Sequence, residues 1–177
     1  MSFLGPQTYP ASITHVPATA DISPKLRADI VAQSLQVAKD AKLISAGYLE
    51  DTNGFAAMMN SKGLFAYNTA TNVNFSVTMR TQDGKGSGYA TRGYNDITKL
   101  DAKAATKIAA DKGLKSAAAQ AIEPGKYTVI LEPAAAAVLL ENIIFGLDAR
   151  QADEGRSFLS KPGGKTSLGE KLVDERV

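Results

Sequence analysis

The residues that could carry chemistry gather late in the chain, beginning with Glu141 and Asn142. The stretch from Ala134 to Leu147 is otherwise apolar, and these two polar side chains interrupt it. Polar groups on a buried helix must find partners or face a cavity. Because burial cannot be read from sequence, two alternatives stay open: the pair lines a cleft, or it lies on the wet side of the helix.

A polar loop follows this stretch and holds three carboxylates, Asp148, Asp153 and Glu154. Paired carboxylates can bind calcium or act as acid and base. Their spacing fits no EF-hand, and Arg150 and Arg156 lie beside them. The pattern is therefore typical of a solvated loop that neutralises its own charges.

The same loop contains Ser157, which raises the possibility of a serine nucleophile. Such a serine needs an adjacent base, but His15 is the only histidine and is remote in sequence. The G-x-S-x-G elbow is also missing, so we expect a polar loop with Phe158 as its anchor. The candidate cleft-lining residues are Glu141, Asn142, Arg156 and Ser157.

Two further motifs favour plain structural roles. His15 lies in a Pro/Thr-rich arm without a nearby Asp or Glu, and a metal site needs several ligands, so an exposed, inert histidine is expected. The glycine-rich run from Gly84 to Gly88 resembles a phosphate loop in composition. It lacks Gly-Lys-Ser/Thr in register, and no helix follows at once, so it predicts a hairpin turn.

Composition excludes several classes of protein. The chain has 177 residues, of which 44% are hydrophobic and 21% charged, as in a globular protein with a real core. Its 20 basic and 18 acidic residues are interspersed, which disfavours a nucleic-acid partner because such binders show a basic patch. The absence of cysteine removes disulfides, thiol catalysis and cysteine–metal sites.

The chain also lacks features of membrane proteins and secreted proteins. Its start has no basic, apolar signal-peptide pattern. The longest apolar run, Ala134 to Leu140, is far shorter than the ~20 residues of a membrane span. We expect a cytoplasmic protein, since the lack of cysteine suits a reducing compartment.

The elements that must position these residues belong to an α+β fold. After an irregular arm over residues 1–22, Ser23 and Pro24 open an amphipathic helix of about 19 residues. Between Leu43 and Tyr94 we expect an antiparallel meander of about five strands, with a turn at Asn53-Gly54. In its 73–81 run, apolar and polar residues alternate.

The second half returns to helices. An Ala-rich helix is expected over 101–111, with Gly113 as its stop. A short buried strand over 127–131 and a buried helix over 134–147 follow. We expect residues 23–123 to be the end of an N-terminal α+β domain and residues 124–177 the start of a C-terminal domain. The end of the chain, near Leu172, has the pattern of an unfinished strand, so we expect a piece of a longer protein.

Three features in order resemble the TldD/PmbA family of peptidases. They are the leading helix with Ala46-Gly47-Tyr48 and the meander, the Gly93-Tyr94 end with its Ala-rich helix, and the Pro-Gly-x-Tyr-x-Val-Ile-Leu-Glu-Pro segment with the helix after it. The resemblance covers residues 23–177. It implies a TldD-type subunit with HExxxH on a helix, where two histidines hold a metal and the glutamate is the general base. A TldE/PmbA-type partner lacks that motif.

At the matching positions this chain has Glu141, Asn142 and Gly146. A lone carboxylate is a poor metal site, and the amide of Asn142 is no base. The resemblance therefore implies the metal-free partner subunit, without a catalytic residue or cofactor of its own and dimeric with a TldD-type paralogue or with itself. An extended peptide would be the substrate, bound by strand addition along the edge of the meander. The older description of the family as a modulator of DNA gyrase finds no support in the charge pattern.

Two other functions stay open from sequence. A stand-alone peptide- or protein-binding scaffold without a protease role accounts equally well for the missing active-site residues. An enzyme that works with carboxylates alone would have to use Asp148, Asp153 and Glu154, and their spacing gives it no further support.

Overall fold

The computed structural model describes residues 3–175 and has the expected α+β fold. The chain forms two compact units that divide between Glu123 and Pro124, and each is described by itself. In the first unit the elements are α1 (Pro17–Ala20), α2 (Pro24–Asp40), β1 (Ile44–Met59), β2 (Phe65–Arg80), β3 (Ser87–Tyr94), η1 (Ile97–Lys99) and α3 (Ala102–Ser116). No helix in the described part of the chain is long and apolar enough to cross a bilayer.

Helix α2 begins where its sequence predicts. The hydroxyl of Ser23 accepts a hydrogen bond from the Leu26 amide at 3.1 Å, and Pro24 occupies the first turn. Arg27 then reaches Asp51 of β1, with its Nη2 3.1 Å from Oδ2. These contacts fix both the start of the helix and its attachment to the sheet.

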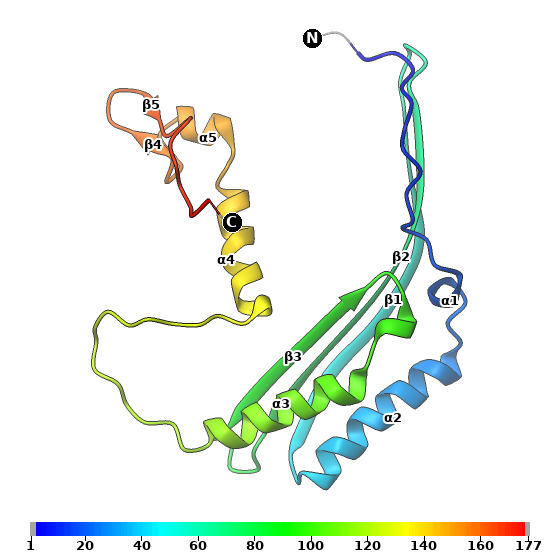
Figure 1. Cartoon of the computed structure of the whole chain (residues 1–177), viewed down its shortest axis with the longest axis vertical. Helices are drawn as coiled ribbons and strands as arrows, with labels where there is room; N and C mark the ends of the chain where they lie inside the picture. Colours follow the sequence, from blue (N-terminus) through cyan, green and yellow to red (C-terminus); the bar gives the residue numbers. More distant parts are fainter. Residues whose placement is uncertain (1–2, 176–177) are drawn as a thin grey trace. The chain divides into compact units, whose positions relative to one another are not determined.

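The three strands form one antiparallel sheet in the order β1-β2-β3. Helices α2 and α3 lie on one face of it (Figure 1). The alternation predicted for residues 73–81 is confirmed, because Val73, Phe75, Val77 and Met79 are buried, while the intervening residues are more exposed. The buried side chains form the core between sheet and helices.

The prediction of about five strands is wrong, because β1 and β2 each run through an expected break. Asn53 and Gly54 pair with Thr71 and Ala70 inside the ladder and form no turn. The chain reverses instead after Asn60, whose Oδ1 accepts hydrogen bonds from the amides of Lys62 and Leu64. This reversal falls at Ser61-Lys62-Gly63, where the sequence also has turn chemistry, and Asn60 anchors it.

The glycine-rich run forms a turn and the start of β3, and it lies against α3. A Cβ on Gly88 would lie 2.1 Å from the Ala109 carbonyl oxygen. Gly113 is inside α3, so its predicted role as a helix stop is wrong; a Cβ there would come within 3.1 Å of the Met79 oxygen. Small residues at these positions allow the close approach of helix and sheet.

Beyond β3, the far ends of β1 and β2 continue as a two-stranded ribbon over residues 53–71 (Figure 1). The N-terminal segment, residues 4–16, runs beside it. Several hydrogen bonds attach the segment, among them one from the Thr71 amide to the Thr14 oxygen and one from the Asn60 side chain to the Leu4 oxygen, both at 3.0 Å. The arm expected to be irregular contains helix α1, which is held in part by the buried hydroxyl of Thr19.

The second unit is small and leaves most of its apolar side chains exposed. Its elements are α4 (Pro133–Phe145), α5 (Ala149–Asp153), β4 (Ser160–Lys161) and β5 (Lys165–Thr166). The strand expected over 127–131 is absent in the described structure, since no strand lies beside it to complete a ladder, and Ile130 is 98% exposed. The prediction of a buried helix over 134–147 is also wrong within this chain, because α4 has no buried residue.

Candidate functional site

The first candidate site is the C-terminal end of α4. The helix begins after Glu132 with Pro133 in its first turn, and it ends at Gly146, whose amide donates to the Ile143 oxygen at 3.0 Å. This geometry places Glu141 and Asn142 in the last turn. The polar side chains that α4 could contribute to a site therefore lie near its C-terminal end, beside the loop that follows α5.

Glu141 and Asn142 both lie at the exposed surface of the helix. Asn142 donates a hydrogen bond from Nδ2 to the Val138 oxygen, at 2.7 Å, one turn back. Glu141 has no hydrogen-bond or ion-pair partner among residues 3–175. Exposure of these two side chains is compatible with both alternatives from sequence, so a place in a cleft and a place on the wet side of the helix both stay predictions.

Gly146 and Ser157 are brought together by the fold. The Ser157 hydroxyl donates to the Gly146 oxygen at 3.0 Å and also accepts from the Leu159 amide. The ring of Phe158 covers Gly146 so closely that a Cβ there would lie 2.4 Å from ring atom Cε1. This contact joins residues on either side of α5, and no sequence motif indicates it.

The carboxylates of the loop have structural partners. Asp148 caps α5 by accepting a hydrogen bond from the Gln151 amide at 2.7 Å. Glu154 accepts from Arg150 Nε at 2.7 Å and from Arg156. The hydrogen bond from Arg150, then that from Arg156, lowers the pKa of Glu154 below its ordinary value. Arg156 is therefore directed toward Glu154.

The residues at this site do not fit a catalytic metal. Zinc sites of this kind need three protein ligands, from imidazole, carboxylate or thiolate side chains. Of the three positions, only Glu141 offers a carboxylate. The Asn142 amide is bonded to its own helix, and Phe158 covers Gly146. His15 belongs to the other unit. Within the described residues, no group of three His, Asp or Glu side chains could hold a metal ion.

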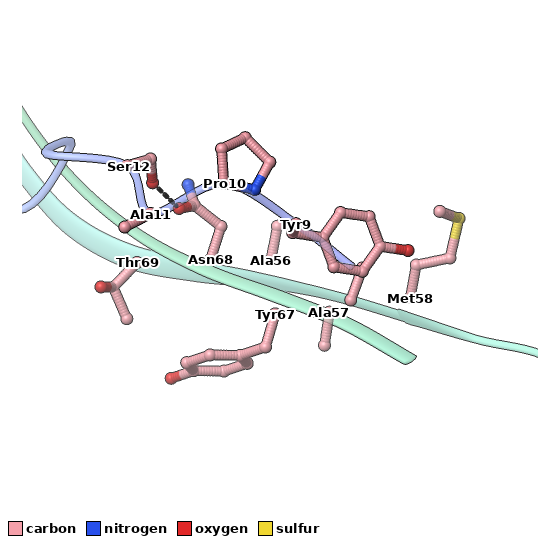
Figure 2. Close-up of a pocket in the computed structure, with 11 residues that line it drawn as sticks. Tyr9, Pro10, Ala11, Ser12, Ala56, Ala57, Met58, Tyr67, Asn68 and Thr69 are labelled. Carbon is pink, nitrogen blue, oxygen red and sulfur yellow. Dashed lines mark hydrogen bonds between the residues drawn. The ribbon is translucent and has the colours of Figure 1, made fainter. Parts of the chain in front are cut away.

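A second candidate is a hollow on the ribbon of unit 1, with a volume of about 750 Å³. Tyr9, Pro10, Ala11 and Ser12 form one wall, and the two strands form the floor (Figure 2). Ser12 donates a hydrogen bond to Asn68 Oδ1 at 2.7 Å, which holds this wall in place. Sequence reasoning did not find this hollow, because it is made by segments that lie far apart in the chain.

Comparison with known proteins defines the class of protein. Residues 17–117 match the model of the PmbA/TldA metallopeptidase central domain, and residues 124–177 match that of the corresponding C-terminal domain. These matches cover more than half of the chain. The chain belongs to the PmbA/TldD family, as its sequence features indicated.

The fold agrees with a solved structure. A Thermotoga maritima protein described as a candidate modulator of a DNA gyrase is 19% identical, with a TM-score of 0.64 over 70% of this chain. The match spans 30% of that protein's length. No curated protein matches the chain.

Proposed function

We propose that this chain is the non-catalytic subunit of a TldD/TldE-like metallopeptidase complex that processes peptides or unfolded segments. The observation that carries the proposal is the C-terminal end of α4, where the resemblance implies HExxxH and the chain has Glu141, Asn142 and Gly146 instead. The family match supplies the peptidase context.

The local geometry supports a role without catalysis. A metallopeptidase needs a metal to activate water and a basic side chain to take its proton. Asn142 donates to its own helix, and Phe158 fills the space beside Gly146. Neither position offers an imidazole or a carboxylate to a metal or to a water proton. The metal and general base of the complex would belong to a TldD-type paralogue that carries HExxxH.

The exposed apolar surface of unit 2 supports assembly with other protein. On α4, more than half of the surface of each of three apolar residues is exposed to solvent: Val138, Ile144 and Phe145. Apolar surface of this extent marks an interaction site or contacts with further protein. The complex proposed here is dimeric and cytoplasmic, without nucleic acid or membrane.

Affinity purification of the full natural protein, with subunits and metal measured in one sample, tests the proposal. We expect a co-purifying HExxxH paralogue in equal amount, with metal and peptidase activity dependent on that subunit. A stoichiometric metal content and peptidase activity in this chain alone would contradict the proposal.

The alternative is a peptide- or protein-binding scaffold without a protease role. The specific observation in its favour is the exposed ribbon of unit 1, which is built from this chain alone. This alternative predicts a metal-free chain that binds its target and purifies without an HExxxH paralogue.

A further inference from the structure

Asn53 and Gly54 form a motif that was expected to be a turn and that the fold keeps inside a strand. Of the asparagines in the chain, only Asn53 is followed by glycine. A glycine at this position leaves its backbone nitrogen unshielded, because it has no Cβ. Such a nitrogen can attack the side-chain carbonyl carbon of the preceding asparagine, which is the chemistry of spontaneous deamidation.

The side chain of Asn53 is also free to react. It is exposed and forms no hydrogen bond with any residue among 3–175. Asn72 is likewise unbonded in this part of the chain, but the branched side chain of Val73 follows it and shields the attacking nitrogen. The other asparagine side chains are held by hydrogen bonds, namely those of Asn60, Asn68, Asn74, Asn95 and Asn142. Asn72 is therefore the internal reference for Asn53.

In the closed sheet, the attacking nitrogen is engaged in the ladder. The Thr71 amide donates to the Thr14 oxygen, so the odd-numbered residues of β2 face away from β1 and the even-numbered residues pair with it. Gly54 lies opposite Ala70 in this register, so its N–H donates to the Ala70 carbonyl oxygen. The extended strand also directs the Asn53 side chain out of the plane of the ladder, away from this nitrogen. Both groups must leave the ladder before they can react.

The base of the ribbon is held more firmly on the β2 side than on the β1 side. Strand β3 ends at Tyr94, so Asn53 and Gly54 lie just beyond the three-stranded part of the sheet. On the β2 side, the Thr71 hydroxyl donates to the Asn95 oxygen at 2.8 Å. In the described structure, β1 has β2 as its one neighbouring strand. A two-stranded ribbon is only marginally stable, and such a region opens locally at less cost than the whole fold.

We propose that Asn53 is a site of spontaneous deamidation that opening of the β1–β2 ladder controls. In the open ribbon, the Gly54 nitrogen forms a bond with Cγ of Asn53 and gives up its proton, and the side-chain amide leaves as ammonia. Water then opens the resulting succinimide ring. Cleavage at Cγ gives aspartate, and cleavage at the backbone carbonyl gives isoaspartate, in which the main chain runs through the side chain. Each conversion consumes a water molecule and releases an ammonia molecule, without oxidation or reduction.

Either product adds a carboxylate near the attachment of α2. Residues two apart in a strand share a face, so the new carboxylate lies on the face of Asp51, whose Oδ2 accepts from Arg27 at 3.1 Å. It repels Asp51 and competes for the charge of Arg27. Isoaspartate also lengthens the main chain, which disturbs the pairing of the residues after it. The inference goes beyond the proposed function, because the reaction needs neither a partner subunit nor a metal.

Peptide mapping of the full chain after incubation in warm, neutral buffer tests the site. Mass spectrometry, with chromatographic separation of aspartate from isoaspartate, should find both forms at position 53 and conversion at least about tenfold faster than at Asn72. Gly54→Ala is the matched variant, since its methyl group meets no atom within 4 Å beyond its chain neighbours. It should slow conversion at position 53 about tenfold by shielding the nitrogen. Equal conversion at Asn53 and Asn72, or no change in Gly54→Ala, would overturn the proposal.

Hydrogen exchange tests the control by the ladder. The Gly54 amide exchanges from the open ribbon, so the ratio of its exchange rates in the folded and the urea-unfolded chain measures how often the ribbon opens. Folding should slow deamidation of Asn53 by the same factor, within about threefold. Thr71→Val, which removes the hydroxyl that anchors the base of the ribbon, should speed both reactions in the folded chain and neither in urea.

Deamidation that is equally fast in the folded and the unfolded chain would overturn the proposal, as would faster exchange in Thr71→Val without faster deamidation. If Thr71→Val fails to fold, the comparison of the two ratios in the unmodified chain decides alone. Because these readouts concern this chain alone, they can fail while the subunit role holds, and the reverse.

Discussion

At the scale of single residues, Phe158 decides what position 146 can hold. An imidazole at Gly146 would have to displace the ring, since even a Cβ would lie 2.4 Å from it. We predict that the triple variant E141H/N142E/G146H binds zinc weakly, and that adding Phe158→Ala tightens zinc binding about tenfold. Competition with a chromophoric chelator measures both affinities, and equal values would show that the ring moves aside freely.

A second residue-scale prediction concerns Asp51, which joins the base of the ribbon to α2. Its side chain is 16% exposed and forms two hydrogen bonds with Arg27, including one at 3.1 Å. Hydrogen bonds to charged groups contribute about 1.5–3 kcal/mol, so Asp51→Asn should lower the free energy of unfolding by about 1–2 kcal/mol. Urea denaturation followed by circular dichroism measures the change.

The exposed pair of Lys25 and Asp29 supplies the matched control. Both side chains are at least half exposed, at 82% and 52%, and such helix pairs contribute only about 0.3–0.5 kcal/mol. Asp29→Asn should therefore be nearly silent. A loss as large as that of Asp51→Asn would mean that global charge, and not the contact with Arg27, sets the effect.

At the scale of elements, the packing of α3 against the sheet depends on Gly88. Because an added methyl group would collide with the backbone of Ala109 and Gly113, Gly88→Ala should destabilise unit 1 by about 3 kcal/mol, at the upper end of overpacking costs. Thermal denaturation measures this loss. Gly54→Ala is the control, since a methyl group added there would meet no atom within 4 Å beyond its chain neighbours, and it should change stability by about 0.5 kcal/mol or less.

The elements that were predicted correctly from the sequence are those that neighbouring residues determine. The alternation from Val73 to Met79 and the Ser23-Pro24 helix start need only neighbouring residues, and both are confirmed. Turns and strands also depend on what pairs with them. Asn53-Gly54 has turn chemistry but stays in the ladder, and residues 127–131 have strand composition but no partner strand in the part of the chain that the structure describes.

The candidate site follows the same division between local and distant causes. The identities at positions 141, 142 and 146 are plain in the sequence, so the lack of HExxxH needed no structure. The contact of Phe158 with Gly146, the hydrogen bond of Asn142 and the hollow beside Tyr9 join residues apart in the chain or depend on rotamers. Composition alone also could not show that α4 would be exposed.

For the whole molecule, the segment between the two units is the expected point of cleavage. Residues 118–131 are exposed and contain no helix or strand. Exposed irregular backbone is the preferred site of proteolytic nicking, so brief trypsin treatment should cut first after Lys126. Mass spectrometry of the fragments checks this, and Lys126→Gln is the control that should delay the first cut. A first cut within α3, for example after Lys107, would contradict the prediction.

Acid should weaken unit 1 through Asp83 and Asp96. A hydrogen bond from Thr81 lowers the pKa of Asp83 below 3.8, and one from Thr98 lowers that of Asp96. Because the unfolded carboxyls bind protons first, the stability they contribute is complete above about 3.8 and is lost as pH falls through the lower, folded pKa values. The melting temperature, measured by thermal denaturation over this pH range, should fall less steeply with decreasing pH in D83N/D96N than in the unmodified chain. An equal slope would show that other groups cause the loss.

The N-terminal segment also limits how many copies of this chain can join through the strand edges of the ribbon. Residues 4–16 lie beside β2 and screen it from solvent, with one backbone hydrogen bond from Thr71 to Thr14. Copies of the ribbon could then meet only through the edge of β1, and strands that meet through one edge stop at a pair. A chain without that segment would have an open edge on each side of the ribbon, and addition of copies could then continue without end. One short segment without Asp, Glu, Lys or Arg thus separates a closed assembly from a growing fibre.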